Sequence, residues 1–177
     1  TKYATREWDM ATGGASACLM FATAGAIVSY MPIGAISSKI GRKRTILIGV
    51  ATLSLCFAAA AVYTIFFHTF HPALYLLFAL VGFAWAAINV NSLPMVVEMC
   101  RDGDVGKFTG LYYTFSMAAQ IVTPILSGFL LENVGYWTLF PYSALFVALS
   151  FVSMLLVRHG DNKPHFEKGL ENFDVED

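Results

Sequence analysis

The sequence predicts an all-α membrane protein with five transmembrane helices, and three observations predict this fold class. Only 13% of the 177 residues are charged and 57% are apolar by type, whereas soluble domains carry about 25% charged residues. All of the charged residues lie outside four long segments: 10–38, 45–97, 108–131 and 136–157. No alternating strand pattern is present, and a chain in hydrocarbon must satisfy its backbone hydrogen bonds internally, so the segments are expected to be helices.

The lengths of these segments divide the chain into five spans. A helix needs about 20 apolar residues to cross about 30 Å of hydrocarbon. Segment 45–97 is long enough for two crossings and contains His68, His71 and Pro72, which favour a turn. The two histidines are expected to be a polar pair in this turn, with a metal pair as the alternative. The expected transmembrane bundle covers residues 10–157, with spans at 10–38, 45–67, 73–97, 108–131 and 136–157; an external lead segment covers 1–9 and a polar tail 158–177.

The distribution of lysine and arginine predicts the orientation of the bundle. Nine of the eleven basic residues fall in the two loops and the tail that five spans place on one side. Short loops rich in basic residues face the cytoplasm. We therefore expect a multi-pass protein of the cell membrane with a cytoplasmic C-terminus and an external N-terminus. Because the lead segment has no feature that would drive its own export, a preceding span is also expected.

Composition and motif spacing exclude several functional classes. The net charge is −1 and the basic residues are scattered among short loops, which predicts no nucleic-acid partner. The cysteines, at positions 18, 56 and 100, lack the spacing of metal ligands, so no metal site is expected. No Asp, Glu, His, Lys or Arg lies in the middle of a span, so no intramembrane enzyme is expected, and no cofactor.

Polar and aromatic side chains within two spans are the candidate substrate contacts. Trp85 lies near the middle of the third span and precedes Asn89 by one turn. Polar residues of the fourth span recur at steps of three and four, which places them on one helical face. An aromatic ring together with amide groups is suited to a sugar, since the ring covers the apolar face and the amides pair with hydroxyl groups. The candidates are Trp85, Asn89, Asn91, Tyr113 and Gln120. The alternatives are core packing with a helix break at Pro94, and hydrogen bonding between helices.

The loop between the first two spans contains the most specific motif. It reads Gly34-Ala-Ile-Ser-Ser38-Lys39-Ile-Gly41-Arg42-Lys43-Arg44. Residues Gly34, Ser38, Lys39, Gly41, Arg42 and Lys43 resemble the signature loop of the major facilitator superfamily, Gly-x-x-x-Asp-(Arg/Lys)-x-Gly-(Arg/Lys)-(Arg/Lys). Ser38 stands where the family has an acidic residue, so the charge pairing that helps to latch the two halves of such transporters is missing here. The second copy of the loop, between the eighth and ninth helices, often departs in this way.

This resemblance implies helices 8–12 of a twelve-helix major facilitator fold, which is most of its C-terminal half. Segments 89–98 and 106–124 narrow the resemblance to the bacterial branch of the sucrose–proton symporter group, close to the glycoside–pentoside–hexuronide cation symporters. The implied function is secondary active transport of a small solute, a sugar or glycoside, by alternating access with a proton. The implied partners are membrane lipid, the N-terminal six-helix half and the preceding helix. The alternatives are a carrier of a non-sugar solute and a non-transporting membrane subunit.

A second pattern predicts an internal repeat. The spacing from Gly34 to Gly41 is matched from Gly128 to Gly135, and each pattern follows a proline in its span. In the expected orientation, the first copy lies at the end of a span that runs toward the cytoplasm. The second copy lies at the end of a span that runs toward the outside. Such opposite orientation is typical of inverted three-helix repeats.

Overall fold

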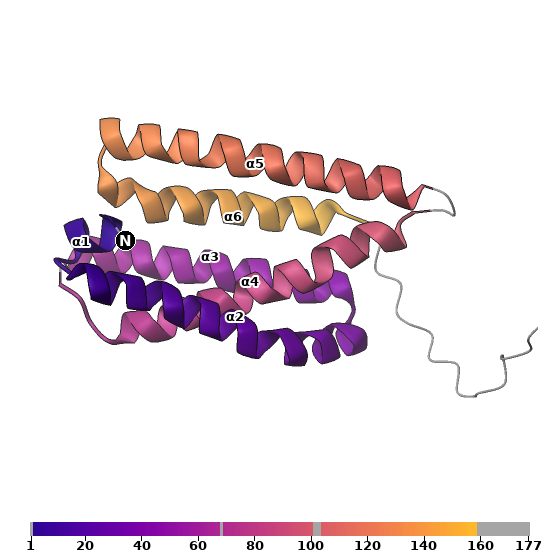
Figure 1. Cartoon of the computed structure of the whole chain (residues 1–177), viewed down its shortest axis with the longest axis horizontal. Coiled ribbons are helices and arrows are strands. Elements are labelled where there is room, and N and C mark those ends of the chain that lie inside the picture. Colours follow the sequence, from indigo (N-terminus) through magenta and orange to yellow (C-terminus); the bar gives the residue numbers. More distant parts are fainter. Residues whose placement is uncertain (1, 68, 101–103, 159–177) are drawn as a thin grey trace, which may run out of the picture.

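The protein is a bundle of five long helices with one short helix at its N-terminal end. The computed structural model describes residues 2–67, 69–100 and 104–158. The five long segments are each long and apolar enough to cross a membrane, as the sequence predicted. In chain order the elements are α1 (Lys2–Glu7), α2 (Thr12–Ile40), α3 (Arg42–Phe66), α4 (Ala73–Glu98), α5 (Val105–Asn133), the 3₁₀ turn η1 (Tyr136–Thr138) and α6 (Leu139–Leu156) (Figure 1).

The helices extend beyond the uncharged segments that predicted them. α2 continues through Lys39, and α3 begins at Arg42 inside the basic cluster. A charged side chain at a helix end does not interrupt the backbone hydrogen bonds, so absence of charge marks the apolar core of a span and not its full helix. α4 likewise continues through Pro94 to Glu98, which is tolerated in membranes where neighbouring helices satisfy the freed backbone groups.

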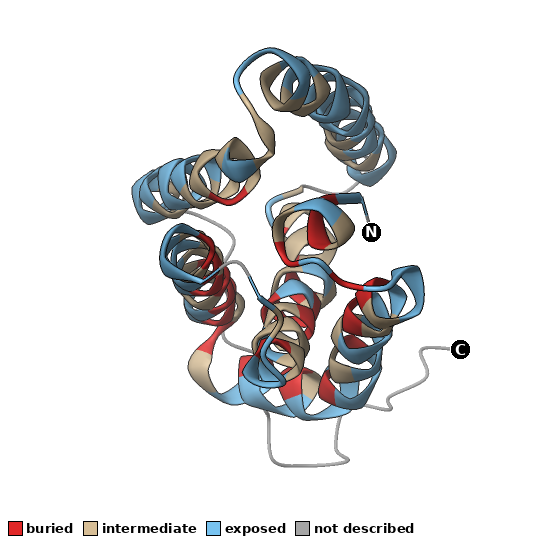
Figure 2. Ribbon diagram, turned by 90° about the vertical axis from the view of Figure 1, so that its left-hand side faces the viewer, coloured by how far each residue is buried: buried red, intermediate tan, exposed pale blue. Residues whose placement is uncertain are grey.

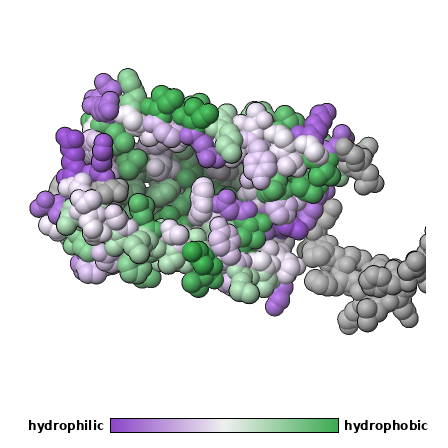
Figure 3. Space-filling view, viewed as in Figure 1, coloured by the Kyte–Doolittle hydropathy of each residue, from purple (hydrophilic) through white to green (hydrophobic). Residues whose placement is uncertain are grey.

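Two ends of the bundle differ in chemistry. We call the end that carries the α2–α3 turn, with Lys39, Arg42, Lys43 and Arg44, the basic end. We call the opposite end, with Tyr3, Trp8, Trp137 and Phe140, the aromatic end. Hydrophilic side chains gather at the two ends of the molecule, and hydrophobic ones cover most of the length between them (Figure 3).

The core lies among α2, α3 and α4. α4 packs most extensively on α2 and then on α3, and α6 packs on α3. By contrast, α5 contributes no buried residue, and its contacts with α4 and α6 are few. In the view along the bundle, the buried residues follow α2, α3 and α4, while α5 is almost entirely exposed (Figure 2).

Glycines set the close approach of α2 and α4. A Cβ atom added to Gly82 would overlap the backbone oxygen of Ala22, and one added to Gly25 would overlap that of Ala79. Without a hydrophobic driving force between helices in lipid, van der Waals contact between closely spaced backbones stabilises their association. The glycines of α2 and α4 thus allow the backbones of these two helices to approach closely.

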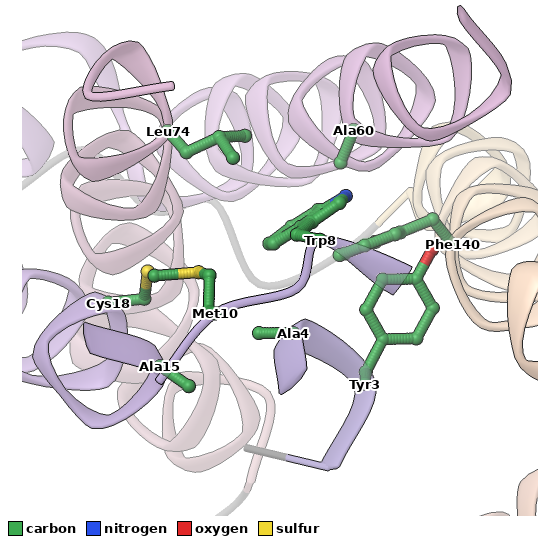
Figure 4. Close-up of a cluster of buried hydrophobic side chains, with 9 residues drawn as sticks. All are labelled: Tyr3, Ala4, Trp8, Met10, Ala15, Cys18, Ala60, Leu74 and Phe140. Atoms are coloured by element: carbon green, nitrogen blue, oxygen red, sulfur yellow. The ribbon is translucent and has the colours of Figure 1, made fainter. Parts of the chain in front are cut away.

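The N-terminal segment folds back onto the aromatic end. Trp8 is 1% exposed, and its Nε1 donates a hydrogen bond to Thr64 Oγ1 at 3.2 Å. The Tyr3 hydroxyl donates to the same oxygen at 3.1 Å. The Trp8 and Phe140 rings stack with centroids 5.8 Å apart (Figure 4). Burial raises the pKa of the Tyr3 hydroxyl above its usual value, so it remains a hydrogen-bond donor at neutral pH.

Two turns adopt the same unusual backbone conformation. Gly41, between α2 and α3, has φ 97° and ψ 151°; Gly135, between α5 and η1, has φ 134° and ψ 158°. This region of backbone space is almost restricted to glycine. Both glycines end the matched spacing noted in the sequence, so the local geometry agrees with an internal repeat of a helix–glycine–helix unit.

A substitution at Gly41 tests the importance of its backbone conformation. We expect Gly41→Val to lower the free energy of unfolding by about 1–3 kcal/mol, because a side chain strains this backbone conformation. Ile40→Val, at the adjacent position, is the control and is expected to cost about 0.5–1.5 kcal/mol or less. Thermal unfolding in detergent measures both. Equal effects at the two positions would show that the turn does not depend on glycine.

Candidate functional site

A cavity of about 530 Å³ lies among the long helices. Residues of α2, α3 and α4 line one side of it, and residues of α5 and α6 line the other; the space-filling view shows a hollow in this face of the molecule (Figure 3). Small residues make room for it, because Ala22, Ala26 and Gly82 line its wall. Ala22 and Gly82 also lie where α2 and α4 pack closely, so this cavity wall carries no large side chain at that point.

The lining of this cavity is aromatic and neutral. Aromatic side chains come from four helices, and hydroxyl groups from three; none of the lining residues is charged. The aromatic residues are Tyr30, Phe57, Trp85, Tyr142 and Phe146, and the hydroxyl residues besides tyrosine are Thr23, Thr123 and Ser143. Apolar cavities with a few placed polar groups are the usual form of small-molecule sites. The cavity is therefore suited to a neutral solute with an apolar face.

Trp85 is the predicted substrate residue that lines the cavity. Trp85 is 54% exposed, although it lies near the middle of α4. Asn89, one turn further along α4, is exposed, and its Nδ2 donates to the Trp85 backbone oxygen at 3.0 Å. Of the five predicted residues, Trp85 therefore lines the cavity, and Asn89 bonds to the backbone of its own helix beside it in sequence.

The other three predicted residues lie apart from the cavity lining. Asn91 is fully buried; its Nδ2 donates to Ala87 O at 2.8 Å, and its Oδ1 has no hydrogen-bond partner. Tyr113 is 47% exposed on α5. Gln120 is also exposed, and its Nε2 contacts Ser116 Oγ at 3.3 Å on the same helix. From the polar face of α5, Thr123 reaches the cavity.

The sequence reasoning missed the contribution of α6. Tyr142, Ser143 and Phe146 form a large part of the cavity wall. Their i, i+1 and i+4 spacing places them on one helical face, but the span is so uniformly apolar that this face does not stand out. Tyr30 of α2 was missed for the same reason.

The signature loop connects three helices at the basic end. Arg42 Nε lies 2.5 Å from Glu98 Oε1, which ties the start of α3 to the end of α4. Lys43 Nζ donates to the backbone oxygens of Leu155 and Val157, at 3.3 and 2.6 Å, which ties α3 to the end of α6. A cation at a helix C-terminus is stabilised by the unsatisfied carbonyl groups there.

The remaining loop residues make local contacts or lie outside the described residues. Ser38 Oγ donates to Ala35 O at 2.8 Å. Gly34 and Lys39 lie in the last turns of α2. The histidine pair that the sequence predicted includes His68, which lies outside the described residues. In the described part of the chain, no group of three or more His, Cys, Asp or Glu residues gathers into a metal site.

Comparison with known families agrees with the loop and the fold. The family model of the Major Facilitator Superfamily matches residues 3–173. The chain belongs to this superfamily. It is thus a major facilitator chain of the multi-pass membrane type, with five membrane-spanning helices in its described residues.

Several curated transporters of the superfamily are similar to this chain. The chloramphenicol resistance protein CraA of Acinetobacter baumannii is 27% identical over 144 residues, which is 81% of this chain and 33% of CraA. The MFS-type transporter ppzB of Metarhizium rileyi is 28% identical over 135 residues, 76% of this chain and 27% of ppzB. An uncharacterized MFS-type transporter of Schizosaccharomyces pombe, C18.02, is 26% identical over 132 residues, 74% of this chain and 28% of C18.02.

This major facilitator chain therefore spans about a third or less of the length of these relatives. No solved structure shows a significant match to it. The comparisons establish the superfamily and leave the solute to be inferred from the cavity.

Proposed function

We propose that this chain is part of a secondary carrier that moves a neutral sugar or glycoside across the cell membrane by alternating access. The observation that carries the proposal is the uncharged cavity, with Trp85 and the hydroxyl groups of Thr123 and Ser143 in its wall. A buried ionic solute would need an opposite charge, because unpaired charges in a membrane interior are costly. A neutral solute with one apolar face and several hydroxyl groups matches aromatic rings and side-chain hydroxyl groups.

We propose that the basic end faces the cytoplasm and the aromatic end faces outward. The bias of lysine and arginine toward the basic end supports this orientation. The exposed α5 and the open side of the cavity support a further proposal: the N-terminal half and a preceding helix of the same protein pack here and complete the wall. We place the proton-coupling group in that other part, since the residues that line this cavity contain no carboxylate.

Substitution of Trp85 in the whole carrier tests the sugar proposal. We expect Trp85→Ala to weaken sugar uptake by about 5- to 30-fold, which corresponds to the loss of about 1–2 kcal/mol of apolar contact. Thr123→Val and Ser143→Ala are each expected to weaken it by about 5- to 150-fold, because a sugar hydroxyl would lose a hydrogen-bond partner in the cavity wall. Initial rates with labelled disaccharides, with and without a proton uncoupler, measure these effects.

The matched controls keep the ring or change a residue away from the cavity. Trp85→Phe retains a stacking surface and is expected to retain most of the uptake. Phe66→Ala removes an exposed aromatic residue at the end of α3 and is expected to leave uptake unchanged. Unchanged uptake in all three site variants would contradict the assignment of the site; absence of sugar uptake in the unaltered carrier would contradict the substrate class.

A second candidate is a carrier of a neutral aromatic compound. The observation that favours it is the largely apolar lining, to which Phe57, Tyr142 and Phe146 contribute. The name of CraA, a chloramphenicol resistance protein, is consistent with such a solute class in one relative. Increased tolerance of chloramphenicol in cells that express the carrier, without disaccharide uptake, would favour this candidate over the sugar.

A further inference from the structure

A second cavity opens at the aromatic end, apart from the central one. Its volume is about 490 Å³, and it lies between α1 and the turn that joins α5 to α6. Its side chains differ from those of the central cavity, because charged groups of both signs face it together with aromatic rings. The polar and aromatic residues that line it are Arg6, Glu7, Glu132, Asn133, Tyr136 and Trp137.

Both walls of this cavity are held in place by the fold. The α1 wall is anchored by the buried Trp8, whose indole N–H donates to Thr64. The opposite wall turns at Gly135, where an added Cβ atom would lie 3.1 Å from the Trp137 ring. Arg6 connects the two walls, because its guanidinium carbon lies 4.5 Å from the centroid of the Tyr136 ring.

The charges of the lining favour a neutral polyhydroxylated ligand. Glu7 and Glu132 disfavour an anion, and Arg6, whose guanidinium lies over the Tyr136 ring, offsets one of the two carboxylates. A hydroxyl group both donates and accepts hydrogen bonds, so it can use carboxylate acceptors and guanidinium donors in the same site. The indole of Trp137 is 53% exposed and offers an apolar surface next to these groups. Asn133 donates through Nδ2 to Phe129 O at 2.8 Å, and its amide oxygen is a further acceptor in the lining.

The position of this cavity relates it to the central one. Tyr142, which lines the central cavity, follows Trp137 by five residues. Trp137 lies in η1, which runs directly into α6, so one continuous segment of the chain contributes to the walls of both cavities.

We propose that the cavity between α1 and the α5–α6 turn is an outer subsite that binds the sugar or glycoside before it enters the central cavity. The proposal rests on the proposed function for its substrate class and for the outward orientation of the aromatic end. The subsite captures the solute at low concentration and is not needed for the transport step itself. It therefore affects the concentration dependence of transport more than its maximal rate.

Uptake kinetics of the whole carrier test this subsite. Trp137→Ala and Glu132→Gln are each expected to raise the KM for sucrose or maltose by about 5- to 20-fold, with a maximal rate within about twofold of the unaltered carrier. Phe66→Ala, an exposed aromatic residue of the same end that does not line the cavity, is the matched control. An unchanged KM in both variants would overturn the subsite, and a lost maximal rate with unchanged KM would do so as well.

A binding measurement separates failure of the subsite from failure of the proposed function. In the whole carrier labelled with 5-fluorotryptophan, single substitutions assign the NMR resonances of Trp8, Trp85 and Trp137. We expect sucrose or maltose to shift the Trp137 resonance, and Glu132→Gln to weaken that shift. A shift without sugar uptake would contradict the proposed function and support the subsite. No shift, or a shift by choline in place of the sugars, would overturn the subsite even where uptake is observed.

Discussion

Replacement of Gly82 by alanine is expected to destabilise the protein strongly, although alanine is the better helix former. A Cβ atom at this position would overlap the backbone oxygen of Ala22, and backbone atoms cannot move aside as a flexible side chain can. We expect a loss of about 1–3 kcal/mol in the free energy of unfolding, and a larger loss for Gly82→Leu. The midpoint of thermal unfolding in detergent measures the effect.

The matched control is the same substitution on a helix that makes no such contact. No atom lies within 4 Å of the position that a Cβ atom would take at Gly106, near the start of α5. Gly106→Ala is therefore expected to stabilise the helix by about 0.5–1 kcal/mol, because alanine loses less backbone entropy. If both substitutions had the same sign, the close crossing of α2 and α4 would not be what constrains Gly82.

Replacement of Trp8 by alanine is expected to have the second large effect. The side chain is almost completely buried against Phe140 and Ala60, and truncation of a buried tryptophan costs about 3–5 kcal/mol. Thr64→Val addresses the hydrogen bonds separately. It removes the acceptor for both Tyr3 and Trp8 and leaves two buried donors unpaired, at about 1–3 kcal/mol each.

Conservative substitutions distinguish packing from hydrogen bonding. Thr64→Ser keeps the acceptor oxygen and is expected to retain most of the stability that Thr64→Val loses. Phe66→Ala, at an exposed position two residues along α3, is expected to change the unfolding midpoint little. Thermal unfolding of the variants checks these outcomes, and a stable Trp8→Ala protein would show that α1 is dispensable for the aromatic end.

The distribution of charge along the chain predicted the five spans. A charged side chain in hydrocarbon is costly, and charged residues can be recognised from the sequence without knowledge of the fold. The fold of α1 could not be predicted in the same way. Tyr3 and Trp8 lie among Lys2, Arg6, Glu7 and Asp9, so the segment has the composition of a solvated lead. Its burial depends on Phe140, a residue far along the chain, and no local pattern contains that contact.

The candidate site was predictable where a residue type is unusual for its surroundings. Trp85 stood out because a tryptophan in mid-span is uncommon outside a functional or core position. Tyr142 and Phe146 did not, because aromatic residues are ordinary in a uniformly apolar span. The arrangement of α4 against α6, which a single sequence does not encode locally, determines that these residues face the same cavity as Trp85.

The contacts of Arg42 and Lys43 have a mechanical consequence. Adjacent residues of one turn hold the ends of two different helices, Arg42 that of α4 and Lys43 that of α6. The start of α3 is therefore linked to the ends of α4 and α6. If one of these three helices tilts at the basic end, the others must move with it or a polar contact must break. α5, which buries no residue against its neighbours, is outside this linkage. Within the described residues, a movement of α5 relative to the other helices would leave both of these polar contacts intact.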